Sequence, residues 1–211
     1  MSYGPNPWQQ AHWDWRAAGN FICGGAGSGL IVFTGISGID GLAGSLLLLA
    51  GLALVGLGLL CVWLEIGRPL RALNVFFNAP TSWMTREAMA SVPLFALGLA
   101  AAWGVRELIP LVVLSAFVFV YCQARIVQAA KGIPAWREPM SEPLLFACGL
   151  TEGGGLYMLA TAWRGPVHAL PALFFAGLLI ARWLLWRAWR ARLEGKAAPR
   201  ALAQIDRVGP A

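Results

Sequence analysis

The chain has 211 residues, of which 58% are hydrophobic and only 12% are charged, with a formal net charge of +6 and a mean hydropathy of +0.64. These values leave too little polar surface for a soluble globular domain. They indicate an integral membrane protein, and we expect membrane lipid rather than nucleic acid to surround it.

The apolar runs of the sequence reach the roughly 20 residues that a helix needs to cross about 30 Å of hydrocarbon. Glycines lie inside these runs, and the alternating ten-residue segments of a membrane β-barrel do not appear. We therefore predict an all-α polytopic transmembrane helical bundle of about six spans, at residues 20–38, 41–64, 86–105, 108–128, 143–163 and 168–189. Residues 1–19 are expected to form an interfacial segment, residues 20–189 the bundle, and residues 190–211 a basic C-terminal tail that reads like the approach to a further helix.

The first predicted span, GNFICGGAGSGLIVFTGISG, carries small residues at several four-residue spacings, including Gly25 and Gly29. Such spacing allows the backbone of another helix, or a flat ring, to approach closely. Helix packing is the common use of this pattern, and contact with a cofactor ring is the alternative.

A second group of interest follows the second span, in the segment WLEIGRPLR. Pro69 stops the helix there, and Glu65 and Arg68 can share one helical face. Charged groups beside a span are informative because ionisable side chains are costly in hydrocarbon. Glu65 has two possible roles: it forms an interfacial ion pair with Arg68, or it exchanges protons.

Two further acids lie in or near predicted spans. In the loop NAPTSWMTREAM, Thr85 fits a helix N-cap and Glu87 falls in the first turn of the third span, so helix capping accounts for both. Glu152 lies within LTEGGGL of the fifth span and is predicted to be the most deeply buried acid. We expect it either to pair with a neighbouring helix or to belong to a proton path.

The cysteines and histidines do not form a metal-binding pattern. Four cysteines fall singly in four predicted spans without the spacing of an iron–sulfur or other metal site, which favours a packing role. The two histidines, His12 and His168, are predicted at opposite membrane faces, so both cannot hold one haem. We therefore expect neither haem, iron–sulfur cluster nor metal ion in this chain.

Four segments in the same order resemble the membrane anchor subunits of molybdopterin oxidoreductases, the group of dimethyl sulfoxide reductase and polysulfide reductase. These segments are GGAGSG in the first span, EIGRPLRA after the second, NAPTSWMTREA before the third, and YCQARIVQAAKGIPAWREPMSEPLLF between the fourth and fifth. They cover about two-thirds of the chain. Members of this group often have eight spans, and they often place His or Asp where this chain has Glu65.

The resemblance implies a haem-free subunit that exchanges electrons between a membrane quinone, menaquinone or ubiquinone, and a four-cluster iron–sulfur subunit. That partner in turn serves a molybdopterin or tungstopterin catalytic subunit. Because quinone chemistry moves protons with electrons, a titratable group must lie within hydrogen-bonding reach of the ring oxygen. Glu65 is the predicted catalytic group, with Glu152 on a proton path; the predicted quinone-binding residues are Asn20, Gly24, Gly25, Arg68 and Tyr121.

Two alternatives belong to other classes of protein. A transporter or lipid-modifying enzyme would be expected to show broken midplane helices or an inverted repeat, and we find no such repeat. A purely structural anchor without a quinone site is the closer alternative. The N-terminal segment and the loops Arg68–Arg86 and Lys131–Glu142 are the predicted docking surface for the iron–sulfur subunit.

The distribution of Lys and Arg predicts the orientation of the chain. With six spans, the N-terminal segment, the loops at 65–86 and 128–142 and the C-terminal tail share one face, and most Lys and Arg residues fall there. The other face has little beyond Arg106 and Arg164. The positive-inside rule then places the N-terminal face in the cytoplasm of a bacterial inner membrane. A cytoplasmic catalytic partner fits the membrane subunit of phenylacetyl-CoA:acceptor oxidoreductase, whereas a reductase of dimethyl sulfoxide, polysulfide or tetrathionate is the alternative.

Overall fold

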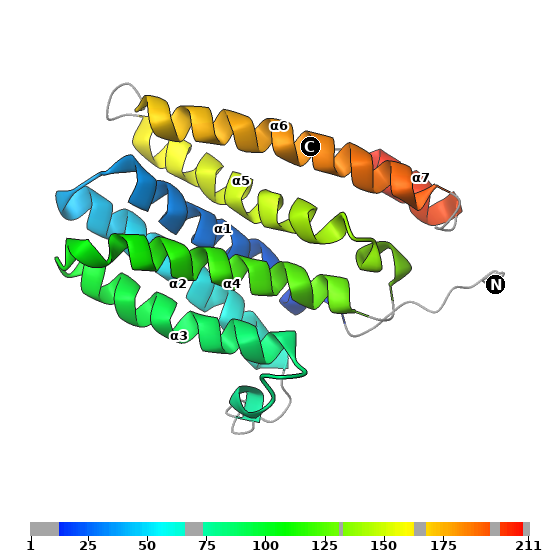
Figure 1. The fold of residues 1–211 in the computed structure, drawn as a ribbon, viewed down its shortest axis with the longest axis horizontal. Coiled ribbons are helices and arrows are strands. Elements are labelled where there is room, and N and C mark those ends of the chain that lie inside the picture. Colours follow the sequence, from blue (N-terminus) through cyan, green and yellow to red (C-terminus); the bar gives the residue numbers. More distant parts are fainter. Residues whose placement is uncertain (1–12, 66–73, 131–132, 163–167, 195–198, 209–211) are drawn as a thin grey trace.

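The computed structural model describes residues 13–65, 74–130, 133–162, 168–194 and 199–208, which form seven α-helices and no strand. The helices are α1 (Trp15–Ser37), α2 (Gly41–Glu65), α3 (Trp83–Ala102), α4 (Ile109–Ala129), α5 (Ser141–Thr161), α6 (Ala169–Leu193) and α7 (Pro199–Val208), with short 3-10 turns η2 (Arg106–Leu108) and η3 (Pro134–Arg137). In Figure 1, α1 lies centrally, α3 forms one edge and α6 the other. The predicted all-α bundle is confirmed.

The helix boundaries differ from the predicted spans by a few residues. Helix α1 begins at Trp15, inside the predicted interfacial segment, because the Asp14 side chain caps it by accepting from the Arg16 backbone N–H. Helix α3 begins at Trp83, and its N-cap is Ser82 rather than Thr85; the Ser82 hydroxyl accepts from the Thr85 backbone N–H at 3.3 Å. Helix α6 extends to Leu193, into the predicted tail.

Five of the helices are long and apolar enough to cross a membrane: α1, α2, α4 together with η2, α5 and α6. Helix α3, the predicted third span, has 20 residues and packs beside α2 and α4 in the same bundle. It is not among the five, because its first turns carry Thr85, Arg86 and Glu87, which lower its hydropathy. The chain is a multi-pass membrane protein with five such spans among the described helices, and α3 lies alongside them.

Glycines bring α1 against α5 and α2 almost backbone to backbone. A Cβ atom on Gly29 would lie 2.5 Å from the Gly149 carbonyl oxygen and 2.9 Å from the Gly153 Cα atom, and one on Gly25 would lie 3.0 Å from the Gly149 Cα atom. Helices in membranes associate through this kind of close contact. Packing between helices is therefore what the spacing of Gly25 and Gly29 achieves.

The antiparallel order of the helices defines two faces of the bundle (Figure 1). We call the N-terminal face the one that holds the starts of α1, α3 and α5 and the ends of α2, α4 and α6. Arg16 ties two of these ends together by donating to the Leu64 carbonyl at 3.1 Å. Basic residues gather on this face among the described residues, namely Arg16, Arg86, Arg125, Arg137, Arg187, Arg190 and Arg192, whereas Arg106 lies on the opposite face and donates to the Gly41 carbonyl.

Candidate functional site

A buried polar cluster lies near the N-terminal face, where α1, α3 and α4 meet. It consists of Asn20, Glu87 and Gln123, whose exposed fractions are only 2%, 3% and 3%. The Asn20 side-chain amide donates to Glu87 Oε1 at 3.1 Å, and the Gln123 side-chain amide donates to the Asn20 backbone carbonyl at 3.0 Å. Three residues far apart in the sequence therefore form one hydrogen-bonded unit, which we call the polar cluster.

Glycines on α1 and α2 make room for the polar cluster. A Cβ atom on Gly24 would lie 2.2 Å from Gln123 Nε2, and one on Gly58 would lie 2.9 Å from the Asn20 carbonyl oxygen. The Gln123 amide therefore occupies the space above Gly24, where the sequence had suggested a quinone ring. Glycine at both positions lets the polar groups approach each other inside the bundle.

Glu87 has no ion-pair partner among the residues that the structure describes. The neighbouring Arg86 faces away: its guanidinium stacks on Trp83 at 4.0 Å and donates to the Ala79 and Pro80 carbonyls. Removing a carboxylate from water without a cation is costly, and such residues inside membrane bundles usually have functional roles. Stability alone does not account for an acid at this position.

Two acceptor atoms of the polar cluster have no hydrogen-bond partner in the part of the chain that the structure describes. They are Asn20 Oδ1 and Gln123 Oε1, and both atoms are fully buried. Buried polar atoms in folded proteins are nearly always paired with protein, water or ligand. The polar cluster therefore has capacity to receive hydrogen bonds from a donor on a bound molecule.

A cavity of about 240 Å³ adjoins the polar cluster at the N-terminal face. Glu65, the last residue of α2, is half-buried and lines the same cavity as Asn20 and Glu87. We call it the two-acid cavity; its lining residues are Trp13, Ala17, Asn20, Phe21, Val62, Glu65, Met84, Glu87 and Ile126. It combines an apolar wall with one buried and one more accessible carboxyl group, which is the usual composition of a small-molecule site.

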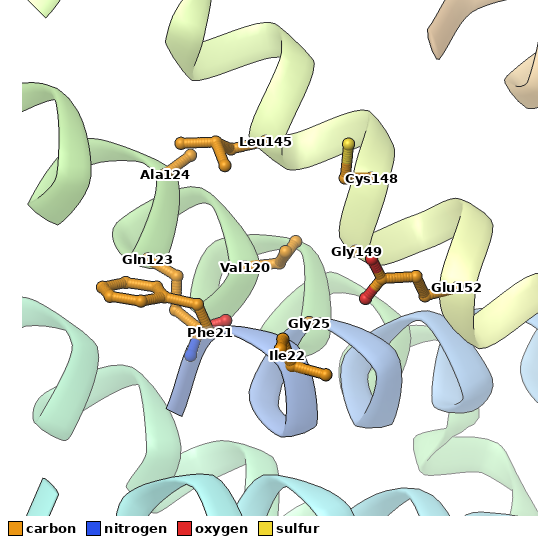
Figure 2. Close-up of a pocket in the computed structure, with 10 residues that line it drawn as sticks. All are labelled: Phe21, Ile22, Gly25, Val120, Gln123, Ala124, Leu145, Cys148, Gly149 and Glu152. Carbon is orange, nitrogen blue, oxygen red and sulfur yellow. The ribbon is translucent and has the colours of Figure 1, made fainter. Parts of the chain in front are cut away.

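A second cavity, of about 120 Å³, lies between α1, α4 and α5 (Figure 2). We call it the α5 cavity; it is lined by Phe21, Ile22, Gly25, Val120, Gln123, Ala124, Leu145, Cys148, Gly149 and Glu152. Glu152 is exposed on the bundle surface, so the prediction that it is the most deeply buried acid is wrong, and Glu87 is far more buried. The apolar residues of α5 are not gathered on one face of the helix, and its sequence therefore did not reveal which face is inside.

The structure brings together some of the predicted site residues and separates others. Glu65 and Asn20 line the two-acid cavity, whereas Gly25 and Glu152 line the α5 cavity. Tyr121 lines neither; it is 39% exposed and packs edge-to-face on Trp83 with ring centroids 5.9 Å apart. Arg68, like His12, lies outside the described residues.

Sequence reasoning missed two buried members of the polar cluster as site residues, Glu87 of α3 and Gln123 of α4. The pattern around Glu87 contained a usable signal, because Ala90 and Ser91, three and four residues later, share its helical face and are small. Small neighbours on the face of an acid allow another helix to approach it. Glu87, Ala90 and Ser91 are all buried in the structure.

The N-terminal face also carries a cluster of charged and aromatic side chains around Trp83. The Arg125 guanidinium lies 4.8 Å from the Trp83 ring and pairs with Glu142 at 2.6 Å. Near it, Trp13 packs edge-to-face on Trp136. These contacts join the starts of α3 and α5 to the end of α4 and form a basic, aromatic rim beside the two-acid cavity.

The cysteines lie singly in α1, α2, α4 and α5 as Cys23, Cys61, Cys122 and Cys148, and all are free thiols. Within the described ranges, no group of three or more His, Cys, Asp or Glu side chains is arranged to hold a metal ion. His168 precedes α6 at the face opposite the start of α1 and is exposed. The candidate site is therefore made of carboxyl and amide groups.

Comparison with known proteins gives one family. No curated protein and no solved structure matches the chain, but the family model described as DMSO reductase anchor subunit (DmsC) matches residues 44–184. The match covers α2 to most of α6, and thus Glu65, the polar-cluster residues of α3 and α4, and Glu152. An apolar helical bundle with carboxyl and amide groups gathered beneath one face agrees with such a subunit, and the chain belongs to the DMSO reductase anchor subunit family, the membrane anchors of molybdopterin oxidoreductases.

Proposed function

We propose that this subunit exchanges electrons with a membrane quinone and that the quinone head group binds in the two-acid cavity. The observation that carries the proposal is the placement of Glu87, which is 3% exposed, has no described cation partner, and lines the cavity together with Glu65. Interconversion of a quinone and its quinol transfers two electrons and two protons. Two carboxyl groups in one cavity supply groups that can hold and pass those protons.

The two acids would have different tasks. Asn20 donates to Glu87 Oε1 and holds the carboxyl group in place, while Asn20 Oδ1 has no partner and can accept from a quinol hydroxyl. Glu65, at the end of α2, is half-buried and lies closer to the N-terminal face. Glu87 thus serves as the group at the ring, and Glu65 as the group that exchanges protons with water.

Electrons would enter or leave at the N-terminal face. We propose that a four-cluster iron–sulfur subunit docks on the rim formed by Trp83, Arg86, Arg125 and Trp136, next to the two-acid cavity. The basic side chains of this face favour an acidic partner surface, and charge complementarity guides such docking. A molybdopterin or tungstopterin subunit would complete the complex.

The substrate of the whole complex follows only if this face is cytoplasmic in a bacterial inner membrane. The structure gathers basic side chains on the N-terminal face, which is the bias that the positive-inside rule associates with the cytoplasm. With that orientation we propose quinone reduction during oxidation of an acyl-CoA such as phenylacetyl-CoA. A fluorescent protein fused to the C-terminus should fluoresce in the cytoplasm. Activity of alkaline phosphatase fused there would instead show the opposite orientation and exclude this substrate.

The quinone site is tested with Glu87→Gln and Glu65→Gln in the assembled complex. Proton transfer by a positioned side chain contributes about 10²- to 10⁴-fold to rate, so Glu87→Gln should lower quinone-linked turnover by at least about 100-fold, while dye-linked activity persists. Glu107→Gln is the matched control, because this exposed acid lies at the opposite face. Unchanged quinone kinetics in both variants would exclude the two-acid cavity as the quinone site. A wild-type complex with dye-linked activity but no quinone-dependent turnover would identify a purely structural anchor.

A further inference from the structure

The α5 cavity is separate from the proposed quinone site, although the polar cluster lies between them. Phe21 lines both cavities, and Gln123 lines only the α5 cavity. Gln123 Nε2 donates to the Asn20 carbonyl, so its Oε1 atom faces elsewhere and has no partner. That oxygen lies 3.0 Å from the position of a Cβ atom on Gly24 and 4.0 Å from one on Gly25, and Gly25 is part of the cavity wall. A buried acceptor without a partner among the described residues thus belongs to a side chain that lines this cavity.

The far side of the α5 cavity is formed by Glu152. Figure 2 shows its carboxyl group reaching from α5 towards the wall that contains Ile22 and Gly25. Glu152 lies near the middle of α5, where it would be at mid-depth in a membrane, and the charge that acts on it is Arg182 of α6. An acid exposed at that depth is costly in hydrocarbon unless water or another polar group reaches it.

The volume of the cavity decides between water and a larger ligand. At about 120 Å³ it has half the volume of the two-acid cavity, which measures about 240 Å³. A single water needs only about 10–15 Å³ of such space, provided that polar partners are present. Gln123 Oε1 and the Glu152 carboxyl group are such partners, so the cavity suits several water molecules.

We propose that the α5 cavity is a hydrated proton passage that joins the polar cluster to Glu152 at mid-depth in the bundle. This inference rests on the proposed quinone site, which supplies or consumes the protons. Glu152 takes up one proton from the cavity water and returns one to it, so its charge is restored after each exchange and no electron moves. Gln123 is a positioning residue, because its Oε1 atom orients water at the inner end.

Hydration can be measured at Cys148, a natural thiol in the cavity wall. In a complex with Cys23, Cys61 and Cys122 replaced by Ala, this subunit keeps one thiol, and a charged, water-soluble methanethiosulfonate reagent should label it. Dye-linked activity verifies that this variant assembles. Labelling by a lipid-soluble maleimide alone, or by neither reagent, would overturn the proposal.

Proton transfer is measured with Glu152→Gln in the complete complex, with decylubiquinone and menadione as acceptors. We expect kcat to fall about tenfold or more with KM unchanged, a larger solvent deuterium isotope effect, and recovery in Glu152→Asp. Wild-type kcat and isotope effect would exclude the passage. If Glu152→Gln fails to assemble, Ile22→Phe offers a second test, because this exposed residue lines the cavity and a larger side chain narrows it. Ile22→Phe should lower kcat in the same way, and a wild-type kcat in this variant would exclude the passage.

The two proposals fail in different ways. Normal quinone kinetics in Glu65→Gln and Glu87→Gln would exclude the two-acid cavity as the quinone site. Loss of quinone turnover in Glu87→Gln together with normal kcat in Glu152→Gln would leave the quinone site intact and exclude only the passage.

Discussion

The two halves of the bundle bury different kinds of side chain. The half near the N-terminal face contains the polar cluster, two cavities and two unpartnered acceptor oxygens. The opposite half is closely packed around Phe33 and Tyr157, whose rings lie 5.9 Å apart and contact Phe174 and Phe175. Both halves belong to the same helices, so the difference lies in their side chains: the proposed site uses the polar groups of one half, and the other half packs aromatic rings.

The largest effect should come from disturbing the packed contact of α1 with α5. A Cβ atom on Gly153 would lie 2.2 Å from the Leu30 backbone nitrogen and 2.3 Å from the Gly29 carbonyl carbon, so Gly153→Ala requires one helix to move. We expect a loss of about 3 kcal/mol or more in the free energy of unfolding, at the upper end of overpacking effects. The measurement is denaturation by sodium dodecyl sulfate in mixed micelles. Gly177→Ala in α6 is the control, because nothing lies within 4 Å of the added atom, and equal stability of the two variants would contradict the packing account.

A smaller effect is expected when one member of the polar cluster is removed. Asn20→Ala deletes the donor to Glu87, and the loss of a buried hydrogen bond worth about 1.4 kcal/mol corresponds to a roughly tenfold decrease in quinone-linked kcat/KM. Thr34→Val supplies the comparison from the other half: Thr34 is also buried, but its hydroxyl donates only to the Leu30 carbonyl in its own helix. If both variants slowed quinone turnover equally, the functional difference between the halves would be refuted.

The smallest effect concerns α7 and the end of α6. Arg190 donates to Asp206 Oδ2 at 2.7 Å, and this guanidinium holds the pKa of the Asp206 carboxyl below its usual value. A lowered pKa in the folded state means that the stabilisation is present at neutral pH and is lost as the pH falls below about 4. We expect α7 to become more susceptible to limited proteolysis in that range, and Asp206→Asn to show the same susceptibility already at pH 7. A variant that resists proteolysis like the wild type would show that this pair does not hold α7.

The sequence predicted the helices well because hydropathy and length are local properties. Glu65 and Asn20, both selected from the sequence, line one cavity because both lie near span ends at the same face. Glu87 was interpreted as a capping acid because its partner Asn20 is 67 residues away and no local pattern announces that contact. The sequence did not distinguish the faces of α5, which explains why the prediction for the burial of Glu152 was wrong. Tyr121 was assigned to the site because the sequence spacing does not show which way its side chain points from α4.

The central claim, that a quinone binds in the two-acid cavity, is tested most directly by photoaffinity labelling. A quinone analogue with a photoreactive group on the ring would be irradiated with the assembled complex, and the labelled peptides identified by mass spectrometry. We predict labels on residues 13–21 of the α1 region and at Met84 of α3, competed by excess unlabelled quinone and reduced in Glu87→Gln. Competed labels confined to the outer surfaces of α5 and α6 would contradict the account.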